Sequence, residues 1–426
     1  MSYIIQHVTV EGLWGVKSFD TDFHTDINIL IGQNRSNKTT FLNLIEGCLN
    51  VDLRPLAQVP FDKIHFHLIN DKDETKEILV EKSYDENWVV IKYLIEEESV
   101  EIRTLEEYDD RPYRYSSIMR ESIMRAKHIL KGMVKMSWLT VDRNPEIYDD
   151  HHSSRNVVDK KLDVLMQELA MYRLKIMEGT NKLNRELNSN VLSLLLFDGD
   201  TDDFDFDDIN RFSSLDPREI KASLYRVFNQ MGNMKQMSDR IQAHIARLTS
   251  VIEKAKTGAS LVLQDAAALV LINRTMTMID LSQKYKTEVD KLMAPIDIYQ
   301  KTLQKFIKDK EFNFSEENGL LEVSWSYLKD GKLTISDLKH QNLSSGEKQL
   351  LILLTQTLLQ EKQPYVFIAD EPELSLHIEW QKDIIGAINT INPNAQVIVA
   401  THSPEIAGQW SDNIISMESI TRYDGR

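Results

Sequence analysis

Residues 27–40 read Ile-Asn-Ile-Leu-Ile-Gly-Gln-Asn-Arg-Ser-Asn-Lys-Thr-Thr, a short apolar run that leads into a polar loop. After the loop, residues 40–49 place apolar side chains at the spacing of a helix. A buried strand followed by a loop and a helix is typical of an α/β fold. The stretch therefore predicts a strand, a loop and a helix, in that order.

The loop from Gly32 to Thr39 has the spacing of a phosphate-binding loop, except that Asn37 stands in place of the second glycine. In such loops backbone N–H groups surround the phosphates, the lysine reaches the β and γ phosphates, and the hydroxyl binds Mg²⁺. Asparagine tolerates positive φ, so the loop can keep its shape. A chance match of the spacing is the alternative. The predicted nucleotide-binding residues are Gly32, Asn34, Ser36, Asn37, Lys38, Thr39 and Thr40.

A second motif is an apolar strand from Tyr365 to Ala369 that ends in two carboxylates, Asp370 and Glu371. At such a place one carboxylate can hold Mg²⁺ and the other can polarise a water molecule. The alternative is a strand that ends in a solvated acidic turn, which Pro372 would fit. The four apolar residues before the carboxylates favour the functional interpretation.

Two shorter motifs flank this strand in the sequence. Ser344, Ser345 and Gly346 begin an expected helix, where free N–H groups can meet a γ-phosphate. The spacing from Ser344 to Glu347 fits an ordinary capping box equally well. His402 follows a buried strand and can hydrogen-bond a γ-phosphate or a catalytic water, although a lone histidine is usually structural.

Length, charge and cysteine content narrow the class of protein. The chain has 426 residues, of which 50 are basic and 66 acidic, and its formal net charge is −16. This charge argues against a protein that coats nucleic acid with its whole surface, but not against a local basic groove. Cys48 is the single cysteine, which excludes a disulfide framework and fits a reducing cytosol. Because the longest apolar stretch is too short to cross a bilayer, we expect a cytoplasmic protein without membrane contact.

The domain organisation is predicted to be α/β, with one head domain that is interrupted by helices. Apolar residues recur every seven positions in two regions, 157–195 and 259–308, which is typical of a helical hairpin or short coiled coil. Pro295 is expected to end or kink the second helix. The expected parts are residues 1–150 (N-terminal half of the head), 151–310 (helical insertion) and 311–426 (C-terminal half of the head).

The order of these motifs resembles that of ABC-type ATPases, in the branch that includes SMC proteins and OLD-family nucleases. There a coiled-coil insertion separates the two halves of the site. The run from Ile368 to Gln381, followed by Ala400 to Glu405, most resembles PtuA-type ATPases of Septu antiphage systems and some retrons. The related ATPases of PARIS defence are similar.

The resemblance implies a set of roles and partners. It implies Lys38 for the phosphates of ATP, Thr39 and Asp370 for Mg²⁺, Glu371 as general base and His402 as γ-phosphate sensor. The segment 344–346 would close in trans over ATP on a second protomer, which requires a homo-oligomer. No nuclease motif is evident in the chain, so cutting is expected from a separate HNH nuclease similar to PtuB. The alternative is an SMC-like DNA-repair or PARIS-type ATPase that uses hydrolysis to drive conformational change.

The chain departs from the family pattern inside the phosphate loop. The pattern has glycines where this chain has Arg35 and Asn37, and the usual glutamine of the Q-loop is not assigned. We therefore expect ATP to act as a conformational ligand that is hydrolysed slowly or not at all.

Three weaker features have competing interpretations. A basic stretch with interleaved tyrosines could contact nucleic acid, or could be a solvated helix face or subunit contact; it includes Arg111, Arg114, Arg120 and Arg125. The acidic run 198–208 fits a tip or a docking segment. His65 and His67 could bind a metal, but the sequence identifies no further ligand, so a structural or solvated role is favoured.

Overall fold

The structure is a computed structural model, and it divides the chain into two compact units. One unit combines Met1–Ala170 with Ile298–Arg426, and the other is Met171–Asp297. The first unit is therefore built from both ends of the sequence. The described residues are 2–86, 88–105, 117–140, 157–194, 214, 216–230, 234–257, 260, 262–329, 332–374 and 376–423.

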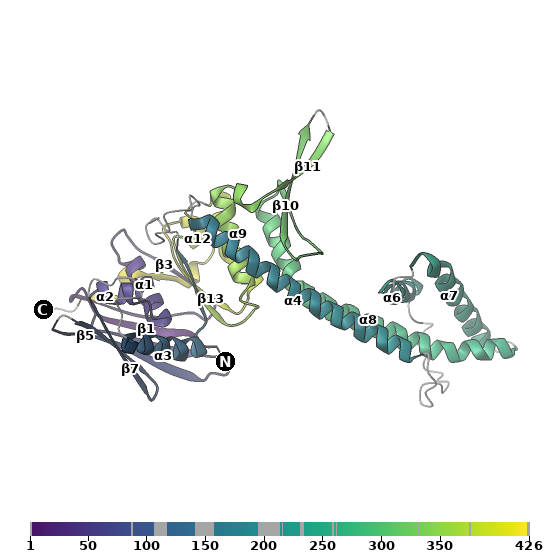
Figure 1. Ribbon diagram of the computed structural model, residues 1–426, viewed down its shortest axis with the longest axis horizontal. Coiled ribbons are helices and arrows are strands. Elements are labelled where there is room, and N and C mark those ends of the chain that lie inside the picture. The colour runs from purple at the N-terminus through teal and green to yellow at the C-terminus, as the bar shows by residue number, and fades with distance from the viewer. Residues whose placement is uncertain are drawn as a thin grey trace. The chain divides into compact units, whose positions relative to one another are not determined.

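A five-stranded parallel sheet forms one layer of the first unit (Figure 1). The strand order is β14-β3-β13-β12-β8. Its apolar strands are buried because helices and the second sheet cover them, which is the usual setting of parallel sheets. The bounds are β3 Ile27–Ile31, β8 Met136–Thr140, β12 Tyr365–Asp370, β13 Ala395–Ala400 and β14 Ile414–Ser416.

Helices of the first unit pack against this parallel sheet. α1 packs against β8, β12 and β13, and α11 packs against β13 and α9. Their bounds are α1 Lys38–Asn50, α2 Leu53–Gln58, α9 Ser345–Leu358, α10 Ile378–Gln381, α11 Ile384–Ile391, α12 Pro404–Gly408 and α13 Met417–Ile420, with short 3₁₀ turns at His340–Asn342 and Ser411–Asn413.

A seven-stranded antiparallel sheet forms the second layer, in the order β15-β2-β1-β4-β5-β6-β7. Alternation of apolar and polar residues puts one face of these strands on the core. One apolar core joins this sheet to α1 and α3. The bounds are β1 Ile4–Leu13, β2 Lys17–Asp22, β4 Lys63–Ile69, β5 Thr75–Asp85, β6 Trp88–Ile95, β7 Glu98–Thr104, α3 Ser117–Met133 and β15 Thr421–Tyr423.

A small three-stranded antiparallel sheet completes the first unit. Its order is β11-β10-β9, with bounds β9 Lys310–Phe314, β10 Leu321–Lys329 and β11 Lys332–Leu338. The polar turn after β11 leads into α9.

The second unit is helical. It holds most of α4 (Val157–Ser193) and α8 (Leu263–Phe306), together with α6 (Pro217–Gln230) and α7 (Met234–Thr257). Within this unit α4 and α8 run side by side, and Arg173 donates a hydrogen bond to the sulfur of Met293 (Figure 1). The buried carboxylate of Asp265 is paired with Arg247 and Lys254 at 2.8 and 3.2 Å.

Two features of the helical unit differ from the sequence prediction. Helices α6 and α7 were not predicted, although they pack with α8 around a common apolar core. Of the two effects expected of Pro295, an end or a kink of the helix, the first was wrong, because α8 continues past Pro295 to Phe306. The predicted acidic run 198–208 lies outside the described residues.

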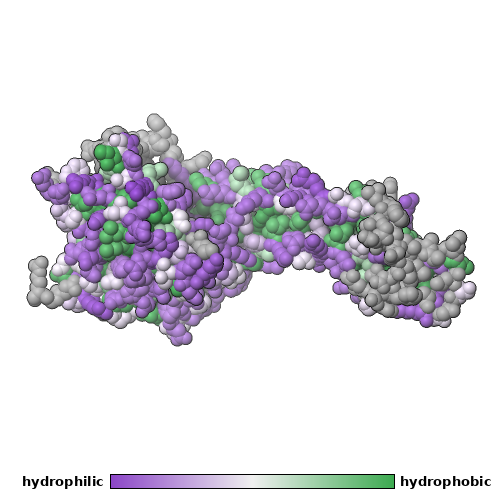
Figure 2. All heavy atoms as spheres, turned by 90° about the horizontal axis from the view of Figure 1, so that it is seen from below, coloured by the Kyte–Doolittle hydropathy of each residue, from purple (hydrophilic) through white to green (hydrophobic). Residues whose placement is uncertain are grey.

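None of the described helices combines the length and the apolar character needed to cross a membrane. On the face drawn in Figure 2, the coloured residues are mainly hydrophilic, with apolar groups between them.

Candidate functional site

The parallel sheet brings three of the predicted motifs to one edge. β3, β13 and β12 are neighbouring parallel strands, so the loops that follow their carboxyl ends meet there. Backbone hydrogen bonds connect these ends, from Thr401 N–H to the Leu30 carbonyl at 3.2 Å and from Glu371 N–H to the Ala400 carbonyl at 2.8 Å. The phosphate loop, the two carboxylates and His402 therefore share one edge.

The backbone of the phosphate loop adopts conformations that favour glycine. Arg35 and Asn37 have φ values of 77° and 70°. The ability of Asn37 to adopt positive φ, inferred from its residue type, is thereby confirmed. Gly32 is required for a different reason: a Cβ atom there would lie 2.7 Å from Oγ of Ser36. The Lys38 ammonium donates back to the Gly32 carbonyl at 2.8 Å, which closes the loop.

Trp14 contacts this loop, and sequence analysis missed it. With the Asn37 amide oriented to satisfy both neighbours, its oxygen accepts from the indole N–H of Trp14 at 3.0 Å and its nitrogen donates to the Arg35 carbonyl at 2.8 Å. Trp14 has a positive φ of 55° and is 48% exposed. Its distance in sequence from the loop left no signal for this contact.

Substitution of Asn37 tests the strain in the loop. We expect Asn37→Ala to be less stable than Asn37→Gly by about 1 kcal/mol, because only alanine has a Cβ atom that opposes a left-handed conformation. The comparison is the free energy of unfolding from urea denaturation of the two variants. Equal stability of the two variants would show that the left-handed conformation is not maintained in solution.

Lys38 and Asp370 lie in a charged and partly buried environment. Burial lowers the pKa of Lys38, and the carboxylates of Asp370, Glu371 and Glu418 oppose this effect only in part. Burial also raises the pKa of Asp370, with a further rise from Glu371, while a hydrogen bond from Thr39 and the charge of Lys38 act in the opposite direction. One cation therefore faces several carboxylates at the strand ends.

The donor set fits a magnesium-bound nucleotide. The Thr39 hydroxyl is hydrogen-bonded to Asp370, and hydroxyl and carboxylate oxygens are ligands that Mg²⁺ prefers. Among the described residues, the buried Oδ1 of Asp370 and the buried Oγ of Ser36 have no hydrogen-bond partner. Polar atoms that are buried without partners are uncommon, and a metal ion or phosphate would satisfy them.

Glu371 and His402 lie beside each other at the same edge. His402 Nε2 is 3.9 Å from Glu371 Oε1, longer than a hydrogen bond, and both side chains are partly exposed. Glu371 has a φ of 48°, an unusual conformation for glutamate. The structure therefore brings the predicted base and the predicted phosphate sensor together.

Two further carboxylates support the site. Buried Glu373 accepts hydrogen bonds from the Thr401 hydroxyl and, at 3.1 Å, from the backbone N–H of His402. Glu418 accepts from the backbone N–H of Gln33 at 3.0 Å. The acidic residues after β12 could have indicated Glu373 as a site residue. No sequence signal indicated Glu418, because it lies 385 residues from its partner Gln33.

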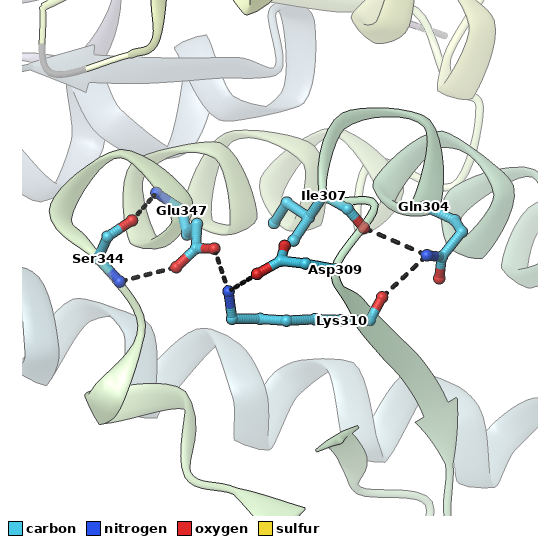
Figure 3. Close-up of polar contacts among 6 residues, drawn as sticks. All are labelled: Gln304, Ile307, Asp309, Lys310, Ser344 and Glu347. Carbon is cyan, nitrogen blue, oxygen red and sulfur yellow. Dashed lines mark hydrogen bonds and ion pairs between the residues drawn. The ribbon is translucent and has the colours of Figure 1, made fainter. Parts of the chain in front are cut away.

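The serine–glycine segment lies at the start of α9. The Ser344 hydroxyl accepts from the backbone N–H of Glu347, and the Glu347 carboxylate accepts from the backbone N–H of Ser344, so the predicted capping box is confirmed (Figure 3). Ser344 and Ser345 are exposed, and Gly346 is half-buried. Within the described chain, no hydrogen bond joins segment 344–346 to the phosphate loop.

An ion pair between Lys310 and Glu347 holds the carboxylate of this capping box in place. The Lys310 ammonium lies 2.6 Å from Glu347 and 2.9 Å from Asp309, and both Lys310 and Glu347 are mostly buried (Figure 3). Burial would raise the pKa of Glu347, but Lys310 and the hydrogen bonds with Ser344 outweigh it and lower the pKa.

The predicted basic stretch is described only in part. Arg111 and Arg114 lie outside the described residues. Arg120 and Arg125 are exposed on α3, and Arg125 pairs with Glu98 at 2.9 Å. Contact with nucleic acid stays a prediction.

Comparison with known proteins defines the class. The family model of the AAA ATPase domain matches residues 4–407, so the chain belongs to this family of nucleotide-binding ATPases. A more particular similarity is to the retron Vc95 probable ATPase of Vibrio cholerae serotype O1 biovar El Tor, with 26% identity over 140 residues. That match covers 30% of this chain and 26% of the relative, so the chain spans about a quarter of the relative's length.

Solved structures with similarity include two SMC heads. One is the Smc head domain of Pyrococcus furiosus with an extended coiled coil, bound to the C-terminal domain of ScpA, at 14% identity and a TM-score of 0.40. The other is the Smc head domain of Pyrococcus yayanosii with a coiled coil and joint, at 15% identity and the same TM-score. Each comparison covers 99% of this chain and 96% of the other.

Proposed function

We propose that the chain is an ATP-binding switch that hydrolyses its nucleotide slowly. The observation that carries this proposal is that the phosphate loop with Lys38 and the strand-end carboxylate of Asp370 lie at the same carboxyl edge of the parallel sheet, where each influences the charge of the other. This edge is where α/β folds bind nucleotides, and the buried unpaired Oδ1 atom of Asp370 suits a metal ligand.

The residues of the site have separate roles in this proposal. Lys38 and the N–H groups of the phosphate loop hold the phosphates, and Thr39 with Asp370 holds Mg²⁺, which neutralises phosphate charge when bound. Glu371 accepts a proton from water. His402 contacts the γ-phosphate, and Glu373 positions it through its backbone N–H.

The slow rate follows from the composition of the phosphate loop. Arg35 places a long side chain where the resembling ATPases have glycine, which restricts how closely the loop surrounds the phosphates. The nucleotide then acts mainly as a conformational ligand.

A homo-oligomer and a nuclease partner complete the proposal. Segment 344–346, in which Ser344 and Ser345 are exposed at the start of α9, would contact ATP bound to a second protomer. The partner would be an HNH nuclease of a retron or Septu type of antiphage defence. The order of the motifs and the similarity to a retron ATPase support this assignment. Contact with nucleic acid would use the local basic stretch that includes Arg111, Arg114, Arg120 and Arg125.

Turnover measurements test the slow rate. We expect the purified protein to bind ATP but to release phosphate slowly. The rate of phosphate release should then fall by only a small absolute amount in Glu371→Gln, because the wild-type rate is already low. The measurement is phosphate release under saturating ATP and Mg²⁺, with Glu405→Gln as an exposed control. Fast turnover that Glu371→Gln abolishes would contradict the proposal of slow hydrolysis.

Co-purification with the neighbouring gene product tests the partner. A nuclease that stays bound, with cutting suppressed by ATP, is the expected result. ATP turnover that DNA stimulates in this protein alone would instead favour an SMC-like repair or PARIS-type ATPase.

A further inference from the structure

Several titratable side chains form a row on the outer face of the seven-stranded sheet. In the strand register, His7 on β1 lies opposite Asp22 on β2 and opposite His67 on β4. His67 in turn lies opposite Glu77 on β5. Because side chains alternate along a strand, His65 points to the same face as His67. The buried residues between and beside them, Ile64, Phe66 and Leu68, point to the core.

Three of these side chains converge. His65 Nε2 is 3.3 Å from one oxygen of Glu77, and His67 Nδ1 is 3.2 Å from the other. The ring centroids of His65 and His67 are 4.3 Å apart. One ligand atom from each of the three residues lies within 4.8 Å of the others. The three side chains are partly exposed, so an ion could enter from solvent.

These separations suit a tetrahedral metal ion. With bonds of about 2.0–2.1 Å, two ligands of a tetrahedral zinc ion lie about 3.3 Å apart. Two imidazoles and one carboxylate are a ligand set that zinc uses when a fourth position is left for water. We propose that His65, His67 and Glu77 bind a zinc ion on the outer face of the seven-stranded sheet, separate from the nucleotide site.

His7 lies behind this site rather than within it. Its ring is 5.6 Å from that of His67. Its Nδ1 is 2.7 Å from Asp22, and its Nε2 is 3.2 Å from Asp20, so both ring nitrogens face other carboxylates. The ion is therefore held by β4 and β5 alone and would link these two neighbouring strands.

Metal titration of the full-length, tag-free protein tests the site. We expect one Zn²⁺ per chain by calorimetry, and visible absorption of a tetrahedral complex when Co²⁺ is used as the probe. His65→Gln and His67→Gln should each weaken binding by about 100-fold, and Glu77→Gln by about tenfold. Bound Zn²⁺ should also raise the melting temperature, because it binds the folded chain.

Two controls separate this site from others. His128→Gln, at an exposed position on α3, should leave Zn²⁺ affinity unchanged. Asp370→Asn should also leave it unchanged, which separates the zinc site from the magnesium site of the nucleotide. Circular dichroism checks that each variant is folded. Equal affinity in the wild type and in a folded His65→Gln/His67→Gln variant, or loss of binding in Asp370→Asn alone, would overturn the proposal.

Discussion

Replacement of Lys38 by methionine should lower the affinity for ATP by about 100-fold or more. The ammonium supplies charge-assisted hydrogen bonds, each of which contributes about 1.5–3 kcal/mol, and methionine supplies none. Loss of the cation also leaves the carboxylates at this edge, Asp370 among them, without a neighbouring positive charge. Repulsion between these carboxylates and the phosphates would then add to the loss of affinity.

Binding of a fluorescent ATP analogue in the presence of Mg²⁺ measures this effect. Lys131→Met is the matched control, because Lys131 is an exposed lysine on α3, far in sequence from the phosphate loop. It should bind the analogue like the wild type. Unchanged affinity for the ATP analogue in a folded Lys38→Met variant would show that the phosphate loop is not part of the nucleotide site.

Replacement of Lys310 by methionine should lower the free energy of unfolding of the first unit by about 3 kcal/mol. The reason is that Glu347 would keep its buried carboxylate but lose the ammonium 2.6 Å away (Figure 3). Removal of one partner of a buried pair costs about 3–5 kcal/mol, because the other charge is left uncompensated. We expect the lower end of this range because the Ser344 N–H still contacts Glu347.

The pH dependence of this loss has a defined sign. The pKa of Glu347 is lowered in the folded protein, so its ionised form stabilises the fold above the pKa of the unfolded chain. That contribution is lost as the pH falls through the lowered pKa. The difference between the wild type and Lys310→Met should therefore be largest near neutral pH and should shrink in acid.

Urea denaturation at neutral and acidic pH measures both effects. The double variant Lys310→Met/Glu347→Met should lose less stability than Lys310→Met alone, because it leaves no buried charge behind. A loss in Lys310→Met that is the same at both pH values would contradict the electrostatic explanation.

The edge of the parallel sheet was predictable because its parts are local in sequence. The apolar run before Gly32 and the apolar run before Asp370 each predict a buried strand. Parallel strands bring their carboxyl ends to the same edge of a sheet. The capping box of Ser344 and Glu347 was also readable, since both residues lie within one helical turn.

Contacts between distant residues were not predictable. Glu418 reaches the phosphate loop, and Glu77 lies between two histidines, only because of strand order and register. A single sequence carries no record of which strands are neighbours. The amphipathic pattern of α6 and α7 was present, but the recurrence of apolar residues in α4 and α8 was more conspicuous.

The position of β3 between β13 and β14 has a consequence for synthesis of the protein. Both neighbours of β3 are encoded about 360 to 380 residues after it, whereas most of the antiparallel sheet is complete by Thr104. At about 5–20 residues per second, the ribosome needs roughly 20 to 70 s to reach them. The strands on both sides of β3 are therefore added only near the end of translation, and we expect a chain truncated before Ala395 not to bind nucleotide.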